Sequence, residues 1–409
     1  MTAPVAYLVS RYPAVSHTFI HREVEGLRAQ GVDVSTYSVR PSEPHQRLTA
    51  ADEEAFRTTA TILGRPAALI ACAQVLTFVK HPRAYVGSLR RALTTGPREH
   101  RARLWQLFYF LEAVVLLRLL QRKPARHLHV HLANNAADVA RLTVDLGHRQ
   151  GDEAWSWSFT MHGPTEFSDV RGSDLAAKVR DAAYVICISD FCRSQLMSLV
   201  EEIHWEKLHV VHCGIDVDRF PDLRAARAGR AGPLRVLNVG RLVEEKAPAV
   251  VIEAVARCRA AGHEVMLRVV GDGPLRRRLA DLASELGIAE HVELTGSIGQ
   301  DTILEHYEWA DVFCLPSFAE GVPIVLMEAM STGLPVVTTA IAGIPELVEH
   351  GVTGFVLAPG RVDLVVESLI ALQDPRARER FSEHTRRTVQ EAFLTATTAA
   401  KVRQLLPLA

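Results

Sequence analysis

The chain has 409 residues, of which 48% are hydrophobic and 23% charged, and its formal net charge is −1. This length favours two domains over one core, and the balanced charge excludes an overall basic field of the kind that attracts nucleic acid. No run reaches the ~18 uncharged apolar residues of a membrane-spanning helix, and the N-terminus lacks the pattern of a signal peptide. With six scattered cysteines and no CxxC pair, we expect a cytoplasmic protein with reduced thiols.

The first half of the chain alternates apolar runs with amphipathic stretches. A strand at 5–10 is followed by a helix ending at Gly31, where a C-cap glycine belongs, and by a strand at 32–40. A helical stretch fills roughly 50–123, and from Lys80 to Arg126 it holds eleven Lys/Arg and two Glu, a balance of +9. Further strands are predicted at 127–133, 155–163, 184–189 and 208–216, with helices between them. This order predicts a parallel sheet.

The second half repeats the alternation after a candidate linker, 221–235, which is rich in Arg, Ala and Gly. Its apolar runs are short and do not alternate, as expected of strands buried on both faces; they lie at 234–240, 264–271, 291–296, 311–316, 335–340 and 353–358. Two such series predict an α/β protein with two Rossmann-like, doubly wound domains. Ligands of such sheets bind at the carboxyl ends of the strands, and two domains facing each other make a cleft there.

Three loops of the second half carry residues suited to a charged ligand. In NVGRLVEEKAP, Arg241 and Lys246 lie between a strand and a helix, where two cations suit a diphosphate; two cations on a surface loop are the alternative. Gly271 in VVGDGPLRRRL lets the backbone approach a ligand, or makes only a tight turn; the missing third glycine weakens a dinucleotide fingerprint. The loop ELTGSIGQD, around Ile298, offers backbone groups to a planar base or is a plain turn.

The segment EGVPIVLMEAM places Glu320 and Glu328 eight residues apart around an apolar run. Pro323 suits the first turn of a helix, so Glu328 falls a turn or more into that helix. A carboxylate buried unpaired among Ile, Val, Leu and Met is costly, and it therefore needs a hydroxyl, a cation or water. The two hydroxyls of a ribose would satisfy Glu328, while Glu320 could reach a second sugar ring. The alternative is that Glu328 points to solvent.

The first half also has candidates at strand ends. His162, in SFTMHGPTEF, ends a strand and could point into the cleft, or it bonds a nearby backbone group. Ser16 and Thr18, at the start of the first helix, could receive an acceptor or phosphate, or cap the helix. The segment HLHVHLA places three histidines on one side of a strand, namely His127, His129 and His131. Because no carboxylate or cysteine stands in register with them, we favour a structural role over a metal site.

Together, NVGRLVEEKAP, VVGDGPLRRRL, GSIGQD and EGVPIVLMEAMSTGLPVVTTAIAGIPELV resemble the group 1 family of glycosyltransferases, over roughly 5–375 of the chain. YPAVSHTFIHREVEGLRAQG, HLHVHLANNAA, SFTMHG and VVHCGID are similar to the exopolysaccharide branch that includes colanic acid biosynthesis glycosyltransferases. The resemblance implies a two-domain GT-B fold and retaining transfer from a nucleotide-diphosphate sugar, without a metal or other cofactor. It also implies domains at 1–220 and 236–380, with 381–409 packing back on the first.

The resemblance implies roles for individual residues. Arg241 and Lys246 would hold the diphosphate, Glu328 the ribose, and Glu320 and His162 the donor sugar. Further donor contacts would come from Gly271, Ile298, Gly321 and Val322. The family usually has glycine where Ala247 stands, which suggests a slightly displaced loop. Front-face attack, with the leaving phosphate assisting proton removal, is the expected mechanism, and Glu320 as a covalent nucleophile is the rival.

Several functional alternatives stay open. A GT-B-type sugar-nucleotide 2-epimerase would share the fold but need no acceptor. A non-catalytic two-domain binding protein is disfavoured by the Arg241 and Lys246 pair, and a dinucleotide oxidoreductase by the missing glycine. We expect a UDP or GDP donor, a saccharide or lipid-linked acceptor and no nucleic acid. The basic 80–126 region predicts peripheral contact with an anionic membrane, or it is a solvated face over helices that pack inward.

Overall fold

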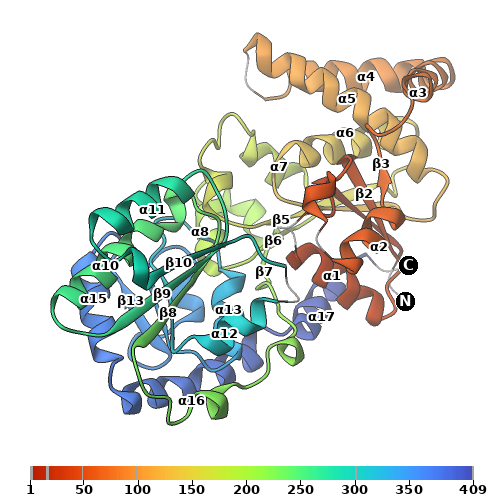
Figure 1. The fold of residues 1–409 in the computed structure, drawn as a ribbon. Helices are drawn as coiled ribbons and strands as arrows, with labels where there is room; N and C mark the ends of the chain where they lie inside the picture. The colour runs from red at the N-terminus through yellow and green to blue at the C-terminus, as the bar shows by residue number, and fades with distance from the viewer. Residues whose placement is uncertain (1–2, 15–17, 48, 97–98, 300–301, 408–409) are drawn as a thin grey trace. The chain divides into compact units, whose positions relative to one another are not determined.

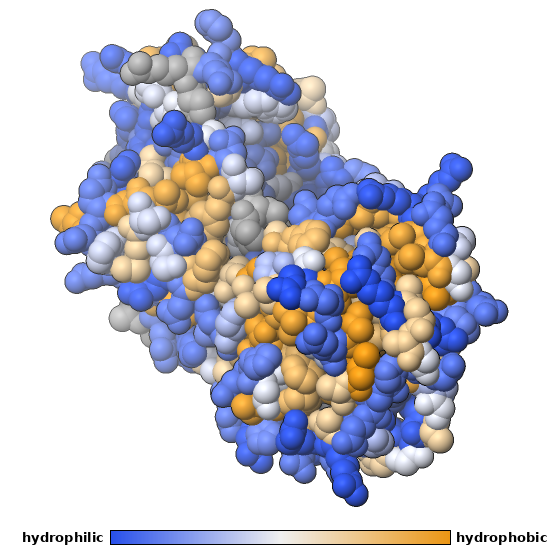
Figure 2. Space-filling view, turned by 90° about the vertical axis from the view of Figure 1, so that its left-hand side faces the viewer, coloured by the Kyte–Doolittle hydropathy of each residue, from blue (hydrophilic) through white to orange (hydrophobic). Residues whose placement is uncertain are grey.

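The computed structural model describes residues 3–14, 18–47, 49–96, 99–299 and 302–407, and its elements are labelled in Figure 1. The chain divides into two compact units. Unit 1 comprises Met1–Val211 and Thr398–Ala409, and unit 2 comprises His212–Thr397. Figure 2 shows one face of the molecule, where hydrophilic side chains surround several separate groups of hydrophobic ones.

Unit 1 contains a parallel sheet of seven strands in the order β3-β2-β1-β4-β5-β6-β7. Its apolar runs become strands buried between two layers of helices, as predicted. The strands are β1 (Val5–Arg11), β2 (Val34–Arg40), β3 (Ala60–Thr61), β4 (His127–His131), β5 (Ser156–Met161), β6 (Val185–Cys187) and β7 (Leu208–Val210). The helices are α1 (Thr18–Ala29), α2 (Ala50–Thr58), α3 (Ala67–Lys80), α4 (Pro82–Thr94), α5 (His100–Leu120), α6 (Asn135–Arg149), α7 (Leu175–Asp181) and α8 (Asp190–Met197). The short β3 lies inside the stretch that we predicted to be wholly helical.

Unit 2 contains a parallel sheet of six strands in the order β10-β9-β8-β11-β12-β13. The strands are β8 (Leu234–Val239), β9 (Val265–Val270), β10 (Val292–Gly296), β11 (Val312–Leu315), β12 (Val336–Thr339) and β13 (Gly354–Leu357). The helices are α9 (Arg224–Arg227), α10 (Pro248–Ala260), α11 (Arg276–Glu285), α12 (Ile303–Trp309), α13 (Ile324–Ser331), α14 (Ile344–Leu347), α15 (Val362–Ala371) and α16 (Pro375–Ala392). Both units are therefore Rossmann-like parallel sheets with helical layers, as the alternation predicted.

The segment predicted as a linker, 221–235, belongs to unit 2. Arg227 donates to the carbonyl oxygens of Thr332, at 2.9 Å, and Tyr307, at 3.1 Å, and Arg230 donates to that of Trp309 at 2.8 Å. These carbonyls lie at the carboxyl ends of helices, where arginine satisfies groups that lack a partner within the helix. The arginines that we interpreted as signs of a solvated linker instead fasten the segment to unit 2.

The boundary between the two units near the end of the chain also differs from the predicted one. Helix α16 lies in unit 2, where Arg386 donates to the carbonyl oxygens of Phe220 and Ser331. The part that belongs to unit 1 begins at Thr398, inside α17 (Thr395–Leu405), and not at 381. There Ala399, Val402 and Leu406 join the apolar core around β1. The buried face of α16 instead serves unit 2, where Phe381 joins the core around β8 and β9.

Candidate functional site

The order of strands in unit 2 marks a place for a ligand. The chain moves outward from β8 through β9 to β10 and then returns to the other side of β8 as β11. Ligands of open parallel sheets bind outside the carboxyl ends of the strands at such a reversal. The loop after β8 carries Arg241 and Lys246, and the loop after β11 carries Glu320. Three of the predicted site residues therefore come from the two loops that flank the reversal.

An ion pair joins these two loops. The Lys246 ammonium donates a hydrogen bond to Oε1 of Glu320, and the Ser317 hydroxyl donates to the same oxygen at 2.9 Å. The Glu320 side chain is 7% exposed and that of Lys246 is 25% exposed. The backbone amide of Phe318 also donates to the carbonyl of Glu245 at 2.8 Å. The carboxylate is thus held inside the site, while the ammonium reaches its surface.

The rest of the loop after β8 has two further features. Arg241 is exposed, and within the described residues its guanidinium has no hydrogen-bond or ion-pair partner. Ala247 takes the left-handed backbone conformation, with φ 48° and ψ 42°, just before α10. Glycine adopts this conformation readily, whereas it costs an L-residue about 1 kcal/mol. The alanine that we noted as a departure from the resemblance therefore retains a glycine-type turn.

The glycines after β9 serve the packing of neighbouring loops. A Cβ atom at Gly271, whose φ is 137°, would lie 1.9 Å from the carbonyl oxygen of Gly240. A Cβ atom at Gly273 would lie 2.5 Å from that of Leu242. The need for glycine here thus comes from the loop after β8. We had interpreted the close approach as one toward a ligand, and a nucleotide contact of Gly271 stays a prediction.

The loop after β10 is tied to the same place. The amide of Gly271 donates to the carbonyl of Gly296 at 2.9 Å, so the loops after β8, β9 and β10 lie side by side. Ile298 is half-buried in the third of them. After β11, the amide of Gly343 donates to the carbonyl of Gly321 at 3.2 Å, and Val322 is buried. The donor contacts predicted for these residues remain predictions.

Glu328 is buried in α13, contrary to the solvent-facing alternative. Glu328 is 1% exposed, and its Oε2 accepts a hydrogen bond of 2.9 Å from the Tyr307 hydroxyl. We argued that a carboxylate on this apolar face needs a partner. That partner is Tyr307 of α12, which the sequence analysis missed. Ribose hydroxyls could reach Glu328 only if the residues that cover it moved.

In unit 1, the histidines of β4 are held by hydroxyl groups of β5. His127 lies 2.8 Å from the Ser156 hydroxyl and 2.7 Å from that of Ser158. His129 bridges Ser158 and Thr160 at 2.8 and 2.9 Å. Burial lowers the pKa of His127 to about 4 and that of His129 well below its ordinary value. Both imidazoles are therefore neutral groups with paired nitrogens, as the structural interpretation requires.

The third histidine joins a carboxylate and a predicted site residue. Nε2 of His131 lies 3.2 Å from Oε1 of Glu23 in α1, and its Nδ1 lies 2.9 Å from Nε2 of His162. The Tyr7 hydroxyl donates to the same Glu23 oxygen at 2.7 Å. Burial raises the pKa of Glu23, but the nearby His131 and the Tyr7 hydrogen bond outweigh burial and lower it to about 2. Glu23 is thus a buried carboxylate anion.

This cluster also bears on metal binding. We argued against a metal because no carboxylate stood in register with the histidines, but α1 supplies one. Ligand atoms of Glu23, His129 and His131 lie within 4.8 Å of one another, so the three side chains could hold a metal ion. In this structure, however, hydroxyl groups are the neighbours of both His129 nitrogens. The expectation of a metal-free enzyme stays a prediction.

A half-buried carboxylate, that of Glu166, shapes the loops around His162. Glu166 accepts hydrogen bonds from the amides of Ala133, His162 and Gly163, the last at 3.1 Å. These amides follow β4 and β5, so one side chain holds both strand ends together. Burial raises the pKa of Glu166 to about 7, against these amides and nearby Lys178. The sequence analysis missed Glu166, although it stands only four residues after His162.

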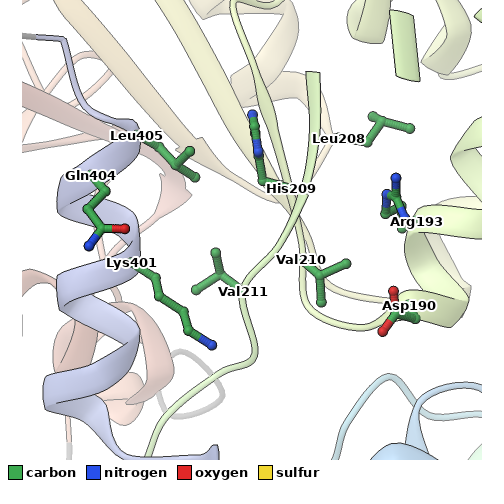
Figure 3. Close-up of a pocket in the computed structure, with 9 residues that line it drawn as sticks. All are labelled: Asp190, Arg193, Leu208, His209, Val210, Val211, Lys401, Gln404 and Leu405. Carbon is green, nitrogen blue, oxygen red and sulfur yellow. The ribbon is translucent and has the colours of Figure 1, made fainter. Parts of the chain in front are cut away.

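The remaining candidates lie at the start of α1. Thr18 is its first residue and is half-buried, and the Phe19 ring contacts that of His162 at a tilt of 40°, with centroids 4.3 Å apart. Ser16 lies outside the described residues. A pocket of about 430 Å³ lies elsewhere in unit 1, where Lys401 of α17 and Arg193 of α8 flank β7 (Figure 3). It contains none of the predicted site residues.

Known proteins resemble this chain in sequence. Residues 220–388 match the family model described as glycosyl transferases group 1. The chain is 26% identical over 370 residues to a putative colanic acid biosynthesis glycosyltransferase, WcaL, of Salmonella typhimurium, covering 86% of each chain. Residues 220–388 therefore resemble the group 1 glycosyltransferases, and the similarity to WcaL extends over most of the chain.

Two further comparisons describe this glycosyltransferase. It is 33% identical over 241 residues to a GDP-mannose-dependent α-(1-6)-phosphatidylinositol monomannoside mannosyltransferase of Mycolicibacterium smegmatis, covering 55% of this chain and 62% of the relative. Its fold matches that of Anabaena Alr3699/HepE, solved with UDP and glucose, with a TM-score of 0.72 and 17% identity, over 98% of this chain and 99% of the other. The predicted GT-B fold is confirmed.

Proposed function

We propose that this glycosyltransferase transfers a sugar from a nucleotide-diphosphate sugar bound at the carboxyl ends of β8 and β11. The Lys246–Glu320 pair carries the proposal because it places a partly exposed ammonium where the loops after β8 and β11 meet, at the reversal of the strand order. Arg241, exposed on the same loop, adds a second cation. A diphosphate is the ligand that two such cations and the start of α10 suit best.

The proposed reaction retains the anomeric configuration. The acceptor oxygen attacks the anomeric carbon from the face that the diphosphate leaves, and its proton passes to an oxygen of the departing phosphate. Arg241 and Lys246 stabilise the charge that develops on the leaving group, which is the part of the reaction where fixed cations lower the barrier most. Glu320, held by Lys246 and Ser317, contacts the donor sugar, and His162 of unit 1 contacts its reacting face.

Glu328 is proposed to bind the ribose. A carboxylate has about four acceptor positions, and in this structure the Tyr307 hydroxyl occupies one of them at 2.9 Å. In the proposed complex, binding uncovers the Glu328 side chain and the ribose hydroxyls donate to its carboxylate. UDP and GDP remain the two candidate donors, because HepE was solved with UDP and the mycobacterial relative is named for GDP-mannose.

The acceptor is proposed to be a lipid-linked saccharide used in exopolysaccharide synthesis at the cytoplasmic membrane face. The name of the relative WcaL supports the pathway. No helix among the described residues is both long and apolar enough to cross a bilayer. Contact with lipid would instead be made by a surface of α3 and α4, which lie at the outer end of unit 1 (Figure 1).

The α3–α4 surface combines exposed apolar and basic side chains. On α3 the residues at helical spacing along one face are exposed, and Val75 and Val79 are 60% and 69% exposed. On α4, Arg83 and Arg90 alternate with exposed apolar residues. The surface comprises Leu69, Val75, Leu76, Val79, Arg83, Val86, Arg90 and Leu93. An apolar stripe beside cations suits an anionic bilayer, at about 1 kcal/mol per cation near the surface.

Vesicle sedimentation tests the membrane proposal. We expect the protein to sediment with anionic but not neutral vesicles, less at high salt, and less after Val79→Asp. Ile203→Asp is the matched control, since Ile203 is an exposed apolar residue of unit 1 outside this surface. Binding that is insensitive to salt, or lost equally in both variants, would contradict the proposal.

A thermal-shift panel of UDP, GDP, ADP and their sugar conjugates tests the donor proposal. A ligand at 100 times its Kd adds about 2.7 kcal/mol of stability, so the nucleotide that the site accepts should stand out. Its effect should be lost in Glu328→Ala. Incubation of the responding donor without acceptor then separates the two enzymatic alternatives, because a 2-epimerase would convert the donor sugar and a transferase would leave it or hydrolyse it slowly.

A further inference from the structure

We propose that Glu23 and His131 are positioning residues that hold the His162 imidazole in one orientation and keep its proton on Nε2. The inference rests on the proposed function in one respect, namely that His162 contacts the reacting sugar. The chain of groups itself, Glu23–His131–His162, is a feature of unit 1 alone. It makes His162 Nδ1 a hydrogen-bond acceptor, so any group that meets this nitrogen, such as a sugar hydroxyl, has to donate.

The chain starts at a fixed negative charge. Glu23 is 9% exposed on the inner face of α1, and Tyr7 of β1 donates to its Oε1 at 2.7 Å. The lowered pKa of Glu23 means that its carboxylate is ionised at neutral pH. An ionised carboxylate can only accept hydrogen bonds. This charge, 3.2 Å from Nε2 of His131, favours a hydrogen on that nitrogen, although the N–H makes no aligned hydrogen bond in this structure.

The position of the hydrogen on His131 then determines which nitrogen of His162 has to donate. It is completely buried, with Nε2 at 3.2 Å from the Glu23 oxygen and Nδ1 at 2.9 Å from Nε2 of His162. If Nε2 of a neutral His131 carries the hydrogen, Nδ1 is an acceptor, and His162 has to donate from Nε2. The partner of one ring nitrogen thus sets the state of the other, as in other imidazoles that are oriented by a carboxylate.

The surroundings leave His162 little freedom. Its backbone amide donates to the half-buried Glu166, which also accepts from the next amide, that of Gly163. The Phe19 ring packs on the imidazole with centroids 4.3 Å apart. The backbone, the ring face and one ring nitrogen of His162 are each fixed by a different element. Such support is what a catalytic imidazole needs to keep its geometry during turnover.

The first experiment measures the hydrogen position directly. Imidazole ¹⁵N spectra of the full chain at pH 8, where an ordinary imidazole is neutral, should show hydrogen on Nε2 of His162 in the wild type. Glu23→Leu removes the acceptor and should give a mixture of the two tautomers, whereas Glu23→Gln, whose amide oxygen still accepts, should retain Nε2–H. A wild-type spectrum with hydrogen on Nδ1 of His162 would overturn the inference, whatever the activity.

The second experiment asks whether Glu23 acts through His162. Glu23→Leu should lower kcat about 10- to 100-fold, the range for groups that orient a functional imidazole, while Glu23→Gln stays within about threefold of wild type. In a His162→Ala background, Glu23→Leu should cause no further loss. An equal loss in both backgrounds would mean a purely structural role and would overturn the inference.

Two controls separate the remaining explanations. Tyr7→Phe removes the other hydrogen bond to the same Glu23 oxygen and should leave kcat within about threefold of wild type. Metal analysis of the purified protein should find no ion whose removal by a chelator changes the His131 or His162 signals; a bound ion would replace the relay by a metal site. Wild-type turnover of His162→Ala would refute the proposed role of His162 and leave the measured tautomer chain intact.

Discussion

Replacing Glu320 by glutamine tests the ion pair at the reversal of the unit 2 sheet. Glutamine keeps the volume and can still accept from Ser317, but it exchanges the charge-assisted bond to Lys246 for a neutral one. Hydrogen bonds to charged groups contribute about 1.5–3 kcal/mol and neutral ones about 0.5–1.5, so the expected loss of stability is about 1–2 kcal/mol. The larger cost of breaking a fully buried pair does not apply, because the Lys246 side chain is 25% exposed.

Calorimetry and turnover measurements together give the result. For a unit of this size, 1 kcal/mol shifts Tm by about 2–4 °C, so Glu320→Gln should lower the unit 2 transition by roughly 2–8 °C. Turnover should fall at least about 100-fold while the Kd for nucleoside diphosphate changes less than about tenfold, as expected for a group that contacts the reacting sugar. Ser317→Ala, which keeps the charge pair, is the matched control. Turnover of Glu320→Gln within threefold of wild type would remove Glu320 from the site.

Three further predictions concern buried polar groups. Tyr307→Phe removes a donor to the buried Glu328 carboxylate and should lower the free energy of unfolding by about 1.5–3 kcal/mol in denaturant titrations; a change below about 0.5 kcal/mol would show that this bond does not stabilise the fold. The folded-state pKa of His127, about 4, lies below its ordinary 6.5, so its contribution to stability is present above pH 6.5 and is lost as pH falls toward 4. The wild type should therefore lose about 3 kcal/mol relative to His127→Gln over that range, and a difference independent of pH would contradict the burial argument. Burial raises the pKa of Glu112 from 4.5 to about 7, so its stabilising contribution is complete below pH 4.5 and is lost as pH rises through 7. Glu112→Gln should gain about 3 kcal/mol on the wild type between pH 4.5 and 8, and an equal difference at both pH values would show that the Glu112 carboxyl is solvated.

The sequence predicts the fold well because both halves alternate short apolar runs with helices, a pattern that parallel sheets impose. It also places Arg241, Lys246 and Glu320 at strand ends. The contact between Lys246 and Glu320 could not be predicted from the sequence, because 74 residues separate them and only the strand order brings their loops together. The linker prediction was wrong for a related reason, because arginines such as Arg227 look solvated until the carbonyls that they bind are known.

The cluster of unit 1 shows where a closer look at the sequence would have helped. Glu23 falls on the same face of the first helix as Ile20, Val24 and Leu27, and a carboxylate on such a face needs buried partners. The partners themselves, on β1 and β4, follow only from the pairing of those strands. Gly271 illustrates the opposite case, in which the residue type was interpreted correctly as a close approach but the approaching group is another loop.

The central claim is that a nucleoside diphosphate binds to the loops after β8 and β11. Amide hydrogen exchange of the full chain, with and without the nucleotide selected by the thermal-shift panel, tests it most directly. We expect slower exchange in residues 240–247 and 316–323, and no change at β7 and α17, where the pocket of Figure 3 lies. Protection confined to that pocket, or no protection anywhere in unit 2 at a saturating nucleotide concentration, would contradict the account.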